Sequence, residues 1–367
     1  MKVSVLGWEL PPAFSGGLGI HTINLFTLLA KVIDLEIYVP DSPGLANNYP
    51  FRINRVPVSP WEGNYGSSSD FYSQVLKYNS DLIRVFKNGA SIIHAHDWIT
   101  FPAGTSLKRR NGARLVVTVH STEYDRSGNF NPQERILKIE EEGVRTADAV
   151  IAVSTYTKKR ITDQYGAEPE KVHVIHNGVT SNIYTQVGKN YGSTRKVLYF
   201  GRVTPQKGPK FFIEAAHKVL NKMKDVTFIM AGTGDSIGEQ KALIEQLGIS
   251  DNFEFTGFVS EGEAMKLYRD CDVFVLPAVS EPFGMTVLES MSAGTPAIIS
   301  KTTGVGEALH NVLRTDFWDT DKMAEYILAV LKFRALREII GSRGRLEALN
   351  FTWEKAALKT LEVYNSL

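Results

Sequence analysis

Short runs rich in β-branched and other apolar residues alternate along the first half of the chain with segments whose apolar residues recur at helical spacing. The clearest helical segment is GIHTINLFTLLAKV, residues 19–32. The apolar runs predict β-strands at residues 2–8, 35–40, 91–98, 114–120, 148–154 and 171–179. Alternation of strand and helix is typical of a parallel sheet covered by helices on both faces. The first half therefore predicts a doubly wound α/β domain.

A polar, turn-rich stretch separates this pattern from a second one. Residues 180–195, TSNIYTQVGKNYGSTR, contain few apolar side chains, as expected where a chain crosses between domains. Strands are then predicted at residues 196–203, 226–232, 252–259, 273–279 and 295–300, with helices at 208–223 and 239–248. We predict two doubly wound domains, residues 1–185 and 186–350, facing each other across a cleft. A closing helix is predicted over residues 351–367, with Thr352 at its N-cap.

The composition is that of an ordinary globular protein. Of 367 residues, 43% are hydrophobic and 22% are charged, which is enough for two cores. With 41 basic and 40 acidic residues the formal net charge is +1, so no global field draws the chain to nucleic acid or to anionic membranes. A small-molecule site fits this balance better. The single cysteine, Cys271, lies in an apolar context that predicts a buried thiol.

The N-terminal sequence and the hydropathy pattern indicate a cytoplasmic protein. The opening residues, MKVSVLGW, are too few for the apolar region of a signal peptide before Glu9, Pro11 and Pro12 interrupt them. Nowhere does the sequence offer the ~18 consecutive apolar residues of a membrane-spanning helix. We therefore expect no integral membrane segment.

Candidate binding residues follow the predicted strands, because open parallel sheets bind ligands beyond the carboxyl ends of their strands. After the first strand, Gly16, Gly17 and Gly19 permit close approach of the backbone. A helix beginning near Leu18 would direct its first N–H groups towards an anion such as a diphosphate. The alternative is a tight packing turn, since the spacing is not GxGxxG.

Two cations follow the first strand of the second half. Arg202 comes directly after this strand and Lys207 follows shortly after, each beside a glycine. Held at a strand end, they would neutralise a diphosphate leaving group, the largest electrostatic task in transferring a group from a nucleotide. The alternative is that both are solvated surface charges.

The segment SEPFGMTVLE, residues 280–289, places two carboxylates after a later strand. Its Pro-Phe-Gly turn breaks the strand, so we predict Glu281 at the strand end and Glu289 about one turn inside a helix that begins at Met285. A carboxylate accepts hydrogen bonds from both hydroxyls of a diol, as in ribose or a hexose, and the N–H groups of residues 284–286 can hold phosphate oxygens. The alternative is a helix N-terminus that favours glutamate.

Polar side chains also follow three strands of the first half. His94 and His96 share one face of a predicted strand, and His120 and Asn177 come after two others. We interpret His96, nearer the strand end, as a sugar contact, whereas the alternative for His94 is a hydrogen-bonded core histidine. No carboxylate or third histidine follows at the usual ligand spacing, so we predict no metal site.

Together these motifs resemble one family. The residues that carry the resemblance are, in chain order, 16–19 (GGLG), 94–98 (HAHDW), His120, 176–179 (HNGV), Gly201-Arg202 with Lys207, and Glu281 with Glu289. They resemble the retaining nucleotide-sugar glycosyltransferases of the two-Rossmann, GT-B type, over nearly the whole chain. The segment with the two glutamates is the most specific single motif, and the ordered combination is more specific than any member.

The resemblance implies that residues 186–350 bind a nucleotide-diphosphate sugar and that residues 1–185 form the acceptor side. The implied catalytic residues are Glu281, Arg202, Lys207 and His96. The implied donor-binding residues are Gly16, Gly17, Arg202, Lys207, Glu281, Phe283, Gly284, Met285, Thr286 and Glu289, and the sugar or acceptor side has His96, His120 and Asn177. In these roles Arg202 and Lys207 contact the phosphates, Glu281 the transferred sugar and Glu289 the ribose. The C-terminal helix would return to the first domain, and neither a metal nor another cofactor is expected.

Within this family the chain looks most like the glycogen and starch synthases, through HAHDW and PPAFSGGLGIH. This implies transfer of glucose from ADP-glucose or UDP-glucose to an α-1,4-glucan, with retention of configuration. Two positions depart from the bacterial glycogen synthases, since Phe14 stands where those carry lysine and Glu289 where they carry tyrosine. The donor base, the acceptor and the oligomeric state stay open.

Three alternatives remain. The first is a family-4 hexosyltransferase acting on a lipid-linked, phosphorylated or other small acceptor, although segment 65–89 is only mildly basic. The second, an NAD-dependent oxidoreductase, is disfavoured because GxGxxG is missing after the first strand and AGTGD, residues 231–235, is the only near match. The third is a noncatalytic sugar-nucleotide-binding protein, which a test for donor hydrolysis or transfer would separate from an enzyme.

Overall fold

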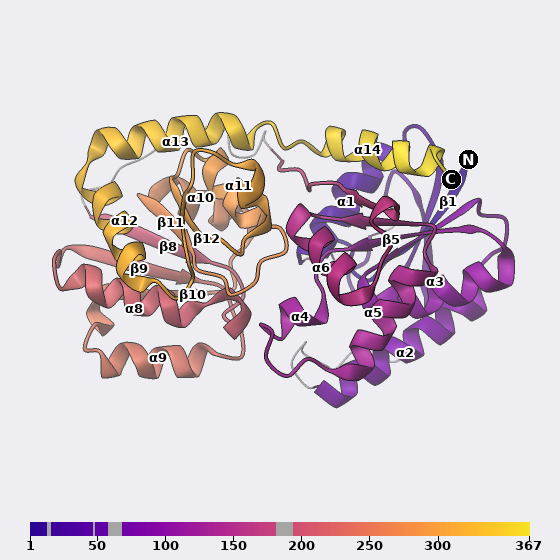
Figure 1. Ribbon diagram of the computed structural model, residues 1–367, viewed down its shortest axis with the longest axis horizontal. Helices are drawn as coiled ribbons and strands as arrows, with labels where there is room; N and C mark the ends of the chain where they lie inside the picture. The colour runs from indigo at the N-terminus through magenta and orange to yellow at the C-terminus, as the bar shows by residue number, and fades with distance from the viewer. Residues whose placement is uncertain (13–15, 47, 58–67, 181–193) are drawn as a thin grey trace. The chain divides into compact units, whose positions relative to one another are not determined.

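The computed structural model describes residues 1–12, 16–46, 48–57, 68–180 and 194–367 (Figure 1). These residues divide into two units. The first unit comprises Met1–Tyr124, Asn131–Asn177 and Trp353–Leu367, and the second comprises Asp125–Phe130 and Gly178–Thr352. Two features discussed above, Phe14 and the domain boundary between residues 185 and 186, lie outside the described residues.

Within the described ranges, the first unit is built on a seven-stranded sheet in which each neighbouring pair of strands is parallel. The strand order is β3-β2-β1-β4-β5-β6-β7. The strands are β1 (Lys2–Leu6), β2 (Asp34–Pro40), β3 (Arg52–Val56), β4 (Ile92–His96), β5 (Arg114–Val119), β6 (Ala149–Ala152) and β7 (Val172–Val174). The order reverses between β1 and β4, and doubly wound sheets bind ligands beyond the carboxyl ends of the strands at such a reversal.

The register brings the carboxyl ends of three central strands to one edge of this sheet. Leu6 of β1 pairs with Ala95 of β4, and His96 of β4 pairs with Thr118 of β5. The helices of the unit are α1 (Gly17–Leu29), α2 (Ser68–Val85), α3 (Asp97–Asn111), α5 (Glu134–Thr146), α6 (Thr155–Tyr165), the 3₁₀ turn η1 (Pro169–Lys171) and α14 (Trp353–Asn365), while α4 (Glu123–Arg126) leads into the second unit. The residues that follow β1, β4 and β5 are therefore neighbours.

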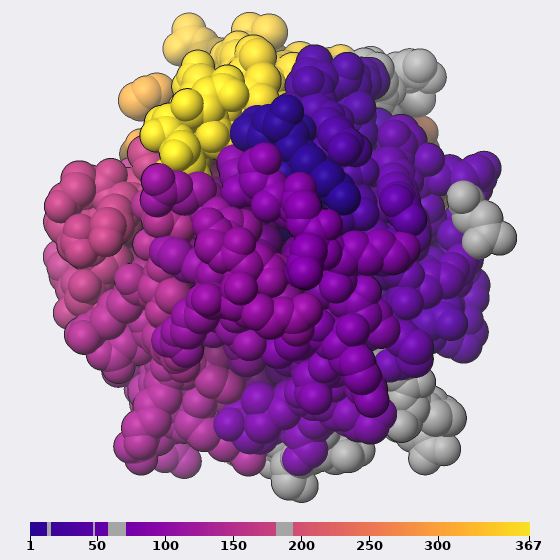
Figure 2. Space-filling view, turned by 90° about the vertical axis from the view of Figure 1, so that its right-hand side faces the viewer, coloured from indigo at the N-terminus to yellow at the C-terminus, as the bar shows by residue number. Residues whose placement is uncertain are grey.

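The C-terminal helix α14 belongs to the first unit, where it packs on α1 (Figure 1). Figure 2 shows its residues, in yellow, beside the indigo residues at the N-terminus of the chain. The buried Tyr364 hydroxyl lies 2.6 Å from Nδ1 of His94 on β4. The predicted return of the last helix to the first domain is confirmed.

In the part of the chain that the structure describes, the second unit contains a six-stranded parallel sheet of order β10-β9-β8-β11-β12-β13. The strands are β8 (Arg195–Phe200), β9 (Val226–Ala231), β10 (Phe253–Gly257), β11 (Val273–Leu276), β12 (Ala297–Ser300) and β13 (Leu313–Thr315). The strand order reverses between β8 and β11. The residues after Phe200 and Leu276 are therefore candidates for ligand binding.

The helical elements of the second unit cover this sheet (Figure 1). They are η2 (Pro205–Lys207), α8 (Pro209–Leu220), α9 (Ile237–Gln246), η3 (Ser250–Asn252), α10 (Glu261–Asp270), α11 (Met285–Ser292), η4 (Gly304–Ala308), α12 (Thr320–Lys332) and α13 (Arg334–Ala348). Segment Asp125–Phe130, from the first half of the sequence, joins this unit, and the Ser280 hydroxyl donates to Asp125 Oδ1 at 2.6 Å. Both side chains are fully buried.

The predicted fold class is confirmed, since the chain forms two doubly wound α/β units with parallel sheets and a C-terminal helix that returns to the first. Cys271 is a buried thiol, as its apolar context predicts. None of the helices in the described ranges combines the length and apolar composition needed to cross a bilayer.

Candidate active site

In the second unit, the reversal between β8 and β11 collects the predicted charged residues. The Lys207 ammonium, on η2, forms an ion pair with Oε2 of Glu281, and their side chains are 18% and 10% exposed. The exposed Arg202 follows β8, and its carbonyl accepts a hydrogen bond from the Tyr199 hydroxyl at 2.9 Å. Burial raises the pKa of Tyr199, the charge of Glu281 raises it further and that of Arg202 opposes the rise. The two cations and Glu281 therefore share one strand-end site.

A glycine makes this arrangement possible. Gly208 follows Lys207 with φ +67°, a left-handed conformation that disfavours other residues. A Cβ atom there would lie 1.9 Å from the carbonyl oxygen of Pro277, directly after β11. Because the backbone of η2 lies so close to the end of β11, the Lys207 side chain can reach Glu281.

The turn after Glu281 is held by backbone hydrogen bonds. The Glu281 amide donates to the Thr302 carbonyl at 3.1 Å, and the Gly304 amide donates to the Glu281 carbonyl at 2.8 Å. Gly284, with φ +106°, precedes α11, which begins at Met285 as predicted. Phe283 is buried, whereas Met285 and Thr286 are partly exposed. The first amides of α11 occupy positions at which a helix leaves its N–H groups without intrahelical partners.

Glu289 lies one turn inside α11 and is partly buried. Burial raises the pKa of its carboxyl to about 7. The Tyr268 hydroxyl donates a hydrogen bond to Oε2 at 2.9 Å, which lowers this pKa, and the charge of Glu261 raises it. The carboxyl therefore changes between its acidic and ionised forms near neutral pH. The ionised form only accepts hydrogen bonds, whereas the acid carries a donor on one of its oxygens.

The glycine-rich turn of the first unit is occupied by a carboxylate of the protein. Oε2 of the buried Glu9, which follows β1, accepts hydrogen bonds from the amides of Gly16 at 2.8 Å and Gly19 at 2.9 Å. Gly16 is the N-cap of α1, so the helix start holds an anion, as its N–H groups favour. Gly16 and Gly17 were predicted from the sequence, whereas Glu9 was not. An acidic residue directly after the first predicted strand was the available signal.

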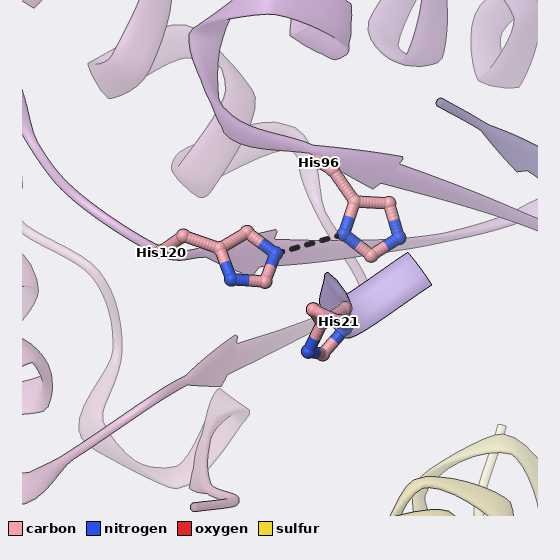
Figure 3. A group of neighbouring side chains, drawn as sticks. All are labelled: His21, His96 and His120. Carbon is pink, nitrogen blue, oxygen red and sulfur yellow. Dashed lines mark hydrogen bonds between the residues drawn. The ribbon is translucent and has the colours of Figure 1, made fainter. Parts of the chain in front are cut away.

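The histidines at the carboxyl edge of the first sheet divide into two kinds. His94 is fully buried with both ring nitrogens bonded, Nδ1 to the Tyr364 hydroxyl and Nε2 to Oγ1 of Thr118 at 2.7 Å. It is a core histidine. His96 ends β4, and its Nδ1 lies 3.0 Å from Nε2 of His120, with the two rings stacked (Figure 3).

A third imidazole, from α1, completes a cluster with these two. The His21 ring lies 4.4 Å from that of His120 and 5.5 Å from that of His96, measured between centroids (Figure 3). His21 Nδ1 lies 2.8 Å from Asn177 Oδ1, so its N–H donates to that oxygen. The structure thus brings the predicted His96, His120 and Asn177 together. The structure also places His21 in this cluster. The sequence did not predict this residue, because a single histidine in an apolar helical segment gives no signal of its own.

Asp97, which lies close to His120 in space, fixes the turn that carries His120. Asp97 begins α3 with φ +52°, whereas the sequence predicted a strand that continues to residue 98. Its Oδ1 accepts hydrogen bonds from the amides of His120 at 2.7 Å and Ser121 at 3.4 Å. The carboxylate therefore holds the backbone at the ends of β4 and β5 in register.

The imidazoles of the cluster are neutral. Burial is the largest cause that lowers the pKa of His21 and His96 well below the usual value, and it lowers the pKa of His120 to about 3. A neutral imidazole offers one donor and one acceptor, which suits sugar hydroxyls, and it is also the form that binds metal ions. One nitrogen from each of the three rings lies within 4.8 Å of the others.

Comparison with known proteins identifies the family to which this chain belongs. Residues 15–182 match the family described as Glycosyltransferase Family 4, and residues 182–347 match Glycosyl transferases group 1. The fold is similar to that of sucrose-phosphate synthase from Thermosynechococcus elongatus, with a TM-score of 0.84 at 20% identity over 100% of this chain and 99% of that one. The chain belongs to the GT-B glycosyltransferases.

Characterised relatives of this glycosyltransferase differ in the acceptor that their names imply. It is 27% identical to the glycogen synthase of Mycobacterium tuberculosis, over 99% of this chain and 94% of the relative. It is 25% identical to the D-inositol 3-phosphate glycosyltransferase of Segniliparus rotundus, over 96% of this chain and 85% of the relative. The likeness in both cases runs through both units.

Proposed function

We propose that this glycosyltransferase transfers glucose from ADP-glucose or UDP-glucose to an α-1,4-glucan, with retention of the anomeric configuration. The observation that carries the proposal is the strand-end site of the second unit, where Lys207 and Arg202 lie with Glu281. Two cations suit a diphosphate, and a carboxylate beside them suits the hydroxyls of the attached sugar. The glycogen synthase relative supports a glucan as acceptor.

The ion pair does not prevent Lys207 from binding phosphate. An ammonium has three N–H donors, so it can keep Glu281 as one partner and offer the others to the donor diphosphate. Arg202, exposed beside it, offers a second cation. We assign to the same donor the backbone of residues 283–286 and Glu289, which would accept hydrogen bonds from the ribose diol.

The transfer step in this proposal takes place on one face of the sugar. The bond between C1 and the β-phosphate oxygen breaks, the acceptor hydroxyl oxygen bonds to C1 from the same side, and its proton passes to the departing phosphate. Lys207 and Arg202 stabilise the charge that develops on that phosphate. The neutral His96 and His120, with Asn177, hold hydroxyls of the sugar and the acceptor, and the step requires no cofactor.

The test is release of nucleoside diphosphate from a panel of nucleotide sugars, with and without glycogen, in wild type and two matched variants. Lys207→Ala should lower kcat by ~10²-fold or more, since one preorganised charge at the leaving group is lost. Lys210→Ala removes an exposed lysine on the next helix and should change little. Near-normal turnover by Lys207→Ala would contradict the assignment, and no release by wild type from any donor would leave a noncatalytic binding protein.

A second candidate keeps the donor and changes the acceptor to a small phosphorylated or lipid-linked molecule. The D-inositol 3-phosphate glycosyltransferase relative favours a small phosphorylated acceptor. Adding inositol phosphates, sugar phosphates and lipid vesicles as acceptors to the same assay separates the two. Release stimulated by one of these and not by glycogen would replace the glucan in our proposal.

A further inference from the structure

The histidine cluster of the first unit leaves ring nitrogens without hydrogen-bond partners. In the described residues, Nε2 of His21 and Nε2 of His96 are buried atoms with no partner. The neighbouring His94 is equally buried, yet both its nitrogens are bonded. Since buried polar atoms are bonded in the great majority of cases, the open Nε2 of His21, beside the facing nitrogens of His96 and His120, points to a ligand.

The bonding of His21 determines which form its open nitrogen takes. Its Nδ1–H donates to Asn177 Oδ1, so in the neutral ring Nε2 carries a bare lone pair. His96 and His120 share a single proton across the contact between Nδ1 and Nε2. If that proton moves to the other nitrogen of its own ring, both facing nitrogens carry lone pairs and can bind one metal ion together with Nε2 of His21.

The spacing of the cluster suits a transition-metal ion. Tetrahedral zinc binds imidazole nitrogens at about 2.0–2.1 Å, which places ligand nitrogens about 3.4 Å apart. The His96 and His120 nitrogens are already 3.0 Å apart, and one nitrogen of each of the three rings lies within 4.8 Å of the others (Figure 3). Shifts of a few tenths of an ångström in the first pair, and closer approach of His21, complete the geometry.

The surroundings also suit a cation. Asn177 fixes the orientation of His21 in the way that outer partners orient metal-binding imidazoles. The Asp97 carboxylate, bonded to the His120 amide, supplies negative charge beside the cluster. His120 is partly exposed, which gives an ion a path from solvent.

We propose that His21, His96 and His120 form a binding site for a divalent transition-metal ion, with zinc as the expected occupant and water as the fourth ligand. Three protein nitrogens with one open position match the coordination of zinc sites that bind an exchangeable ligand. The ion is not needed for the transfer step. If the proposed function holds, an occupied site inhibits transfer, because His96 and His120 are then withdrawn from sugar hydroxyls.

Metal binding is tested without reference to activity. The full-length protein, freed of metal by chelator and dialysis, is titrated with Co²⁺ and followed by visible absorption, and Zn²⁺ affinity is measured by competition with a chromophoric chelator. We expect one equivalent of Co²⁺ to give the intense bands of a tetrahedral site, which Zn²⁺ then displaces. His21→Ala should lower Zn²⁺ affinity by more than about 100-fold, and Asn177→Ala by about 10–100-fold, because the latter removes only an outer partner.

Two controls keep this test decisive. His310→Ala removes an exposed histidine of the second unit and should leave Zn²⁺ affinity unchanged. Asn177→Asp keeps an acceptor for His21 and should retain binding, while melting temperatures without metal show that each variant folds. Weak octahedral bands only, or equal Zn²⁺ affinity in wild type and a folded His21→Ala, would overturn the proposal. Nucleotide release by the metal-free wild type reports separately on the proposed function.

Discussion

The two glutamates of segment 280–289 lie close in sequence but in different electrostatic surroundings. Glu281 has a lysine as its direct partner, whereas Glu289 is bonded by the neutral hydroxyl of Tyr268 in a partly buried position. Burial without a counter-charge favours the neutral carboxylic acid, which is why the pKa of Glu289 rises to about 7. The carboxyl of Glu289 therefore changes its charge near neutral pH.

This difference predicts the pH dependence of donor use. If Glu289 accepts hydrogen bonds from the ribose diol, only the ionised form binds well, so kcat/KM for the donor should fall as the pH drops through about 7. The fall should approach tenfold per pH unit below that value. Initial rates at subsaturating donor between about pH 5.5 and 8.5 provide the measurement.

A glutamine substitution separates Glu289 from other titrating groups. Glu289→Gln should have a lower kcat/KM at pH 8, and its profile should lose the inflection near pH 7. Glu245→Gln, at an exposed position on α9, should keep the wild-type profile. An unchanged inflection in Glu289→Gln would show that another group titrates.

At the scale of elements, hydrophobic periodicity predicted the central strands and the edge strands β7 and β10, but it missed the edge strands β3 and β13. β3 (Arg52–Val56) lies at one edge of the first sheet with exposed or partly exposed polar residues, and β13 (Leu313–Thr315) is a short edge of the second. Edge strands are often short and polar, so their pattern resembles that of a loop. The central strands are buried on both faces and leave a continuous apolar signal.

Helix packing in the first unit depends on one glycine that periodicity does not reveal. A Cβ atom on Gly143 of α5 would lie 2.3 Å from the ring of Phe101 on α3. Gly143→Ala should therefore force the two helices apart and lower the free energy of unfolding by about 1–3 kcal/mol. Urea denaturation followed by circular dichroism measures the change.

A second glycine provides the matched control. Gly238, near the start of α9, has open space at its Cβ position, so Gly238→Ala should be neutral or stabilising by up to about 1 kcal/mol. If Gly143→Ala and Gly238→Ala change the free energy of unfolding equally, α3 and α5 accommodate the added methyl group without loss of stability.

At the scale of the whole molecule, the sequence did not predict His21 because its partners come from distant segments. His21 lies on α1, and it meets His96 and His120 only because α1 packs over the ends of β4 and β5. Glu9, by contrast, follows β1 and bonds Gly16, only seven residues on, so its strand-end position was a usable signal. Strand-end residues could be predicted because topology alone places them at the sheet edge. Side chains on helices could not, since their direction depends on packing.

The position of the C-terminal helix also depends on long-range packing. Substitutions in this helix therefore predict which part of the molecule loses stability. Tyr364 on α14 is 2% exposed and bonds His94, so Tyr364→Ala removes a buried ring and leaves a histidine nitrogen without its partner. The loss should be about 3–5 kcal/mol. Leu358→Ala, on the same helix but 62% exposed, should change the stability by less than about 0.5 kcal/mol.

Because α14 belongs to the first unit, the destabilisation by Tyr364→Ala should be local. Amide hydrogen exchange should quicken in α1, β4 and β5, which belong to the same unit as His94, while β8, β9 and β11 keep their protection, since units with separate cores open separately. Peptide-resolved exchange with mass spectrometry distinguishes the two sheets in one experiment. Uniform loss of protection across both would show that the two units unfold as one, although their cores are distinct.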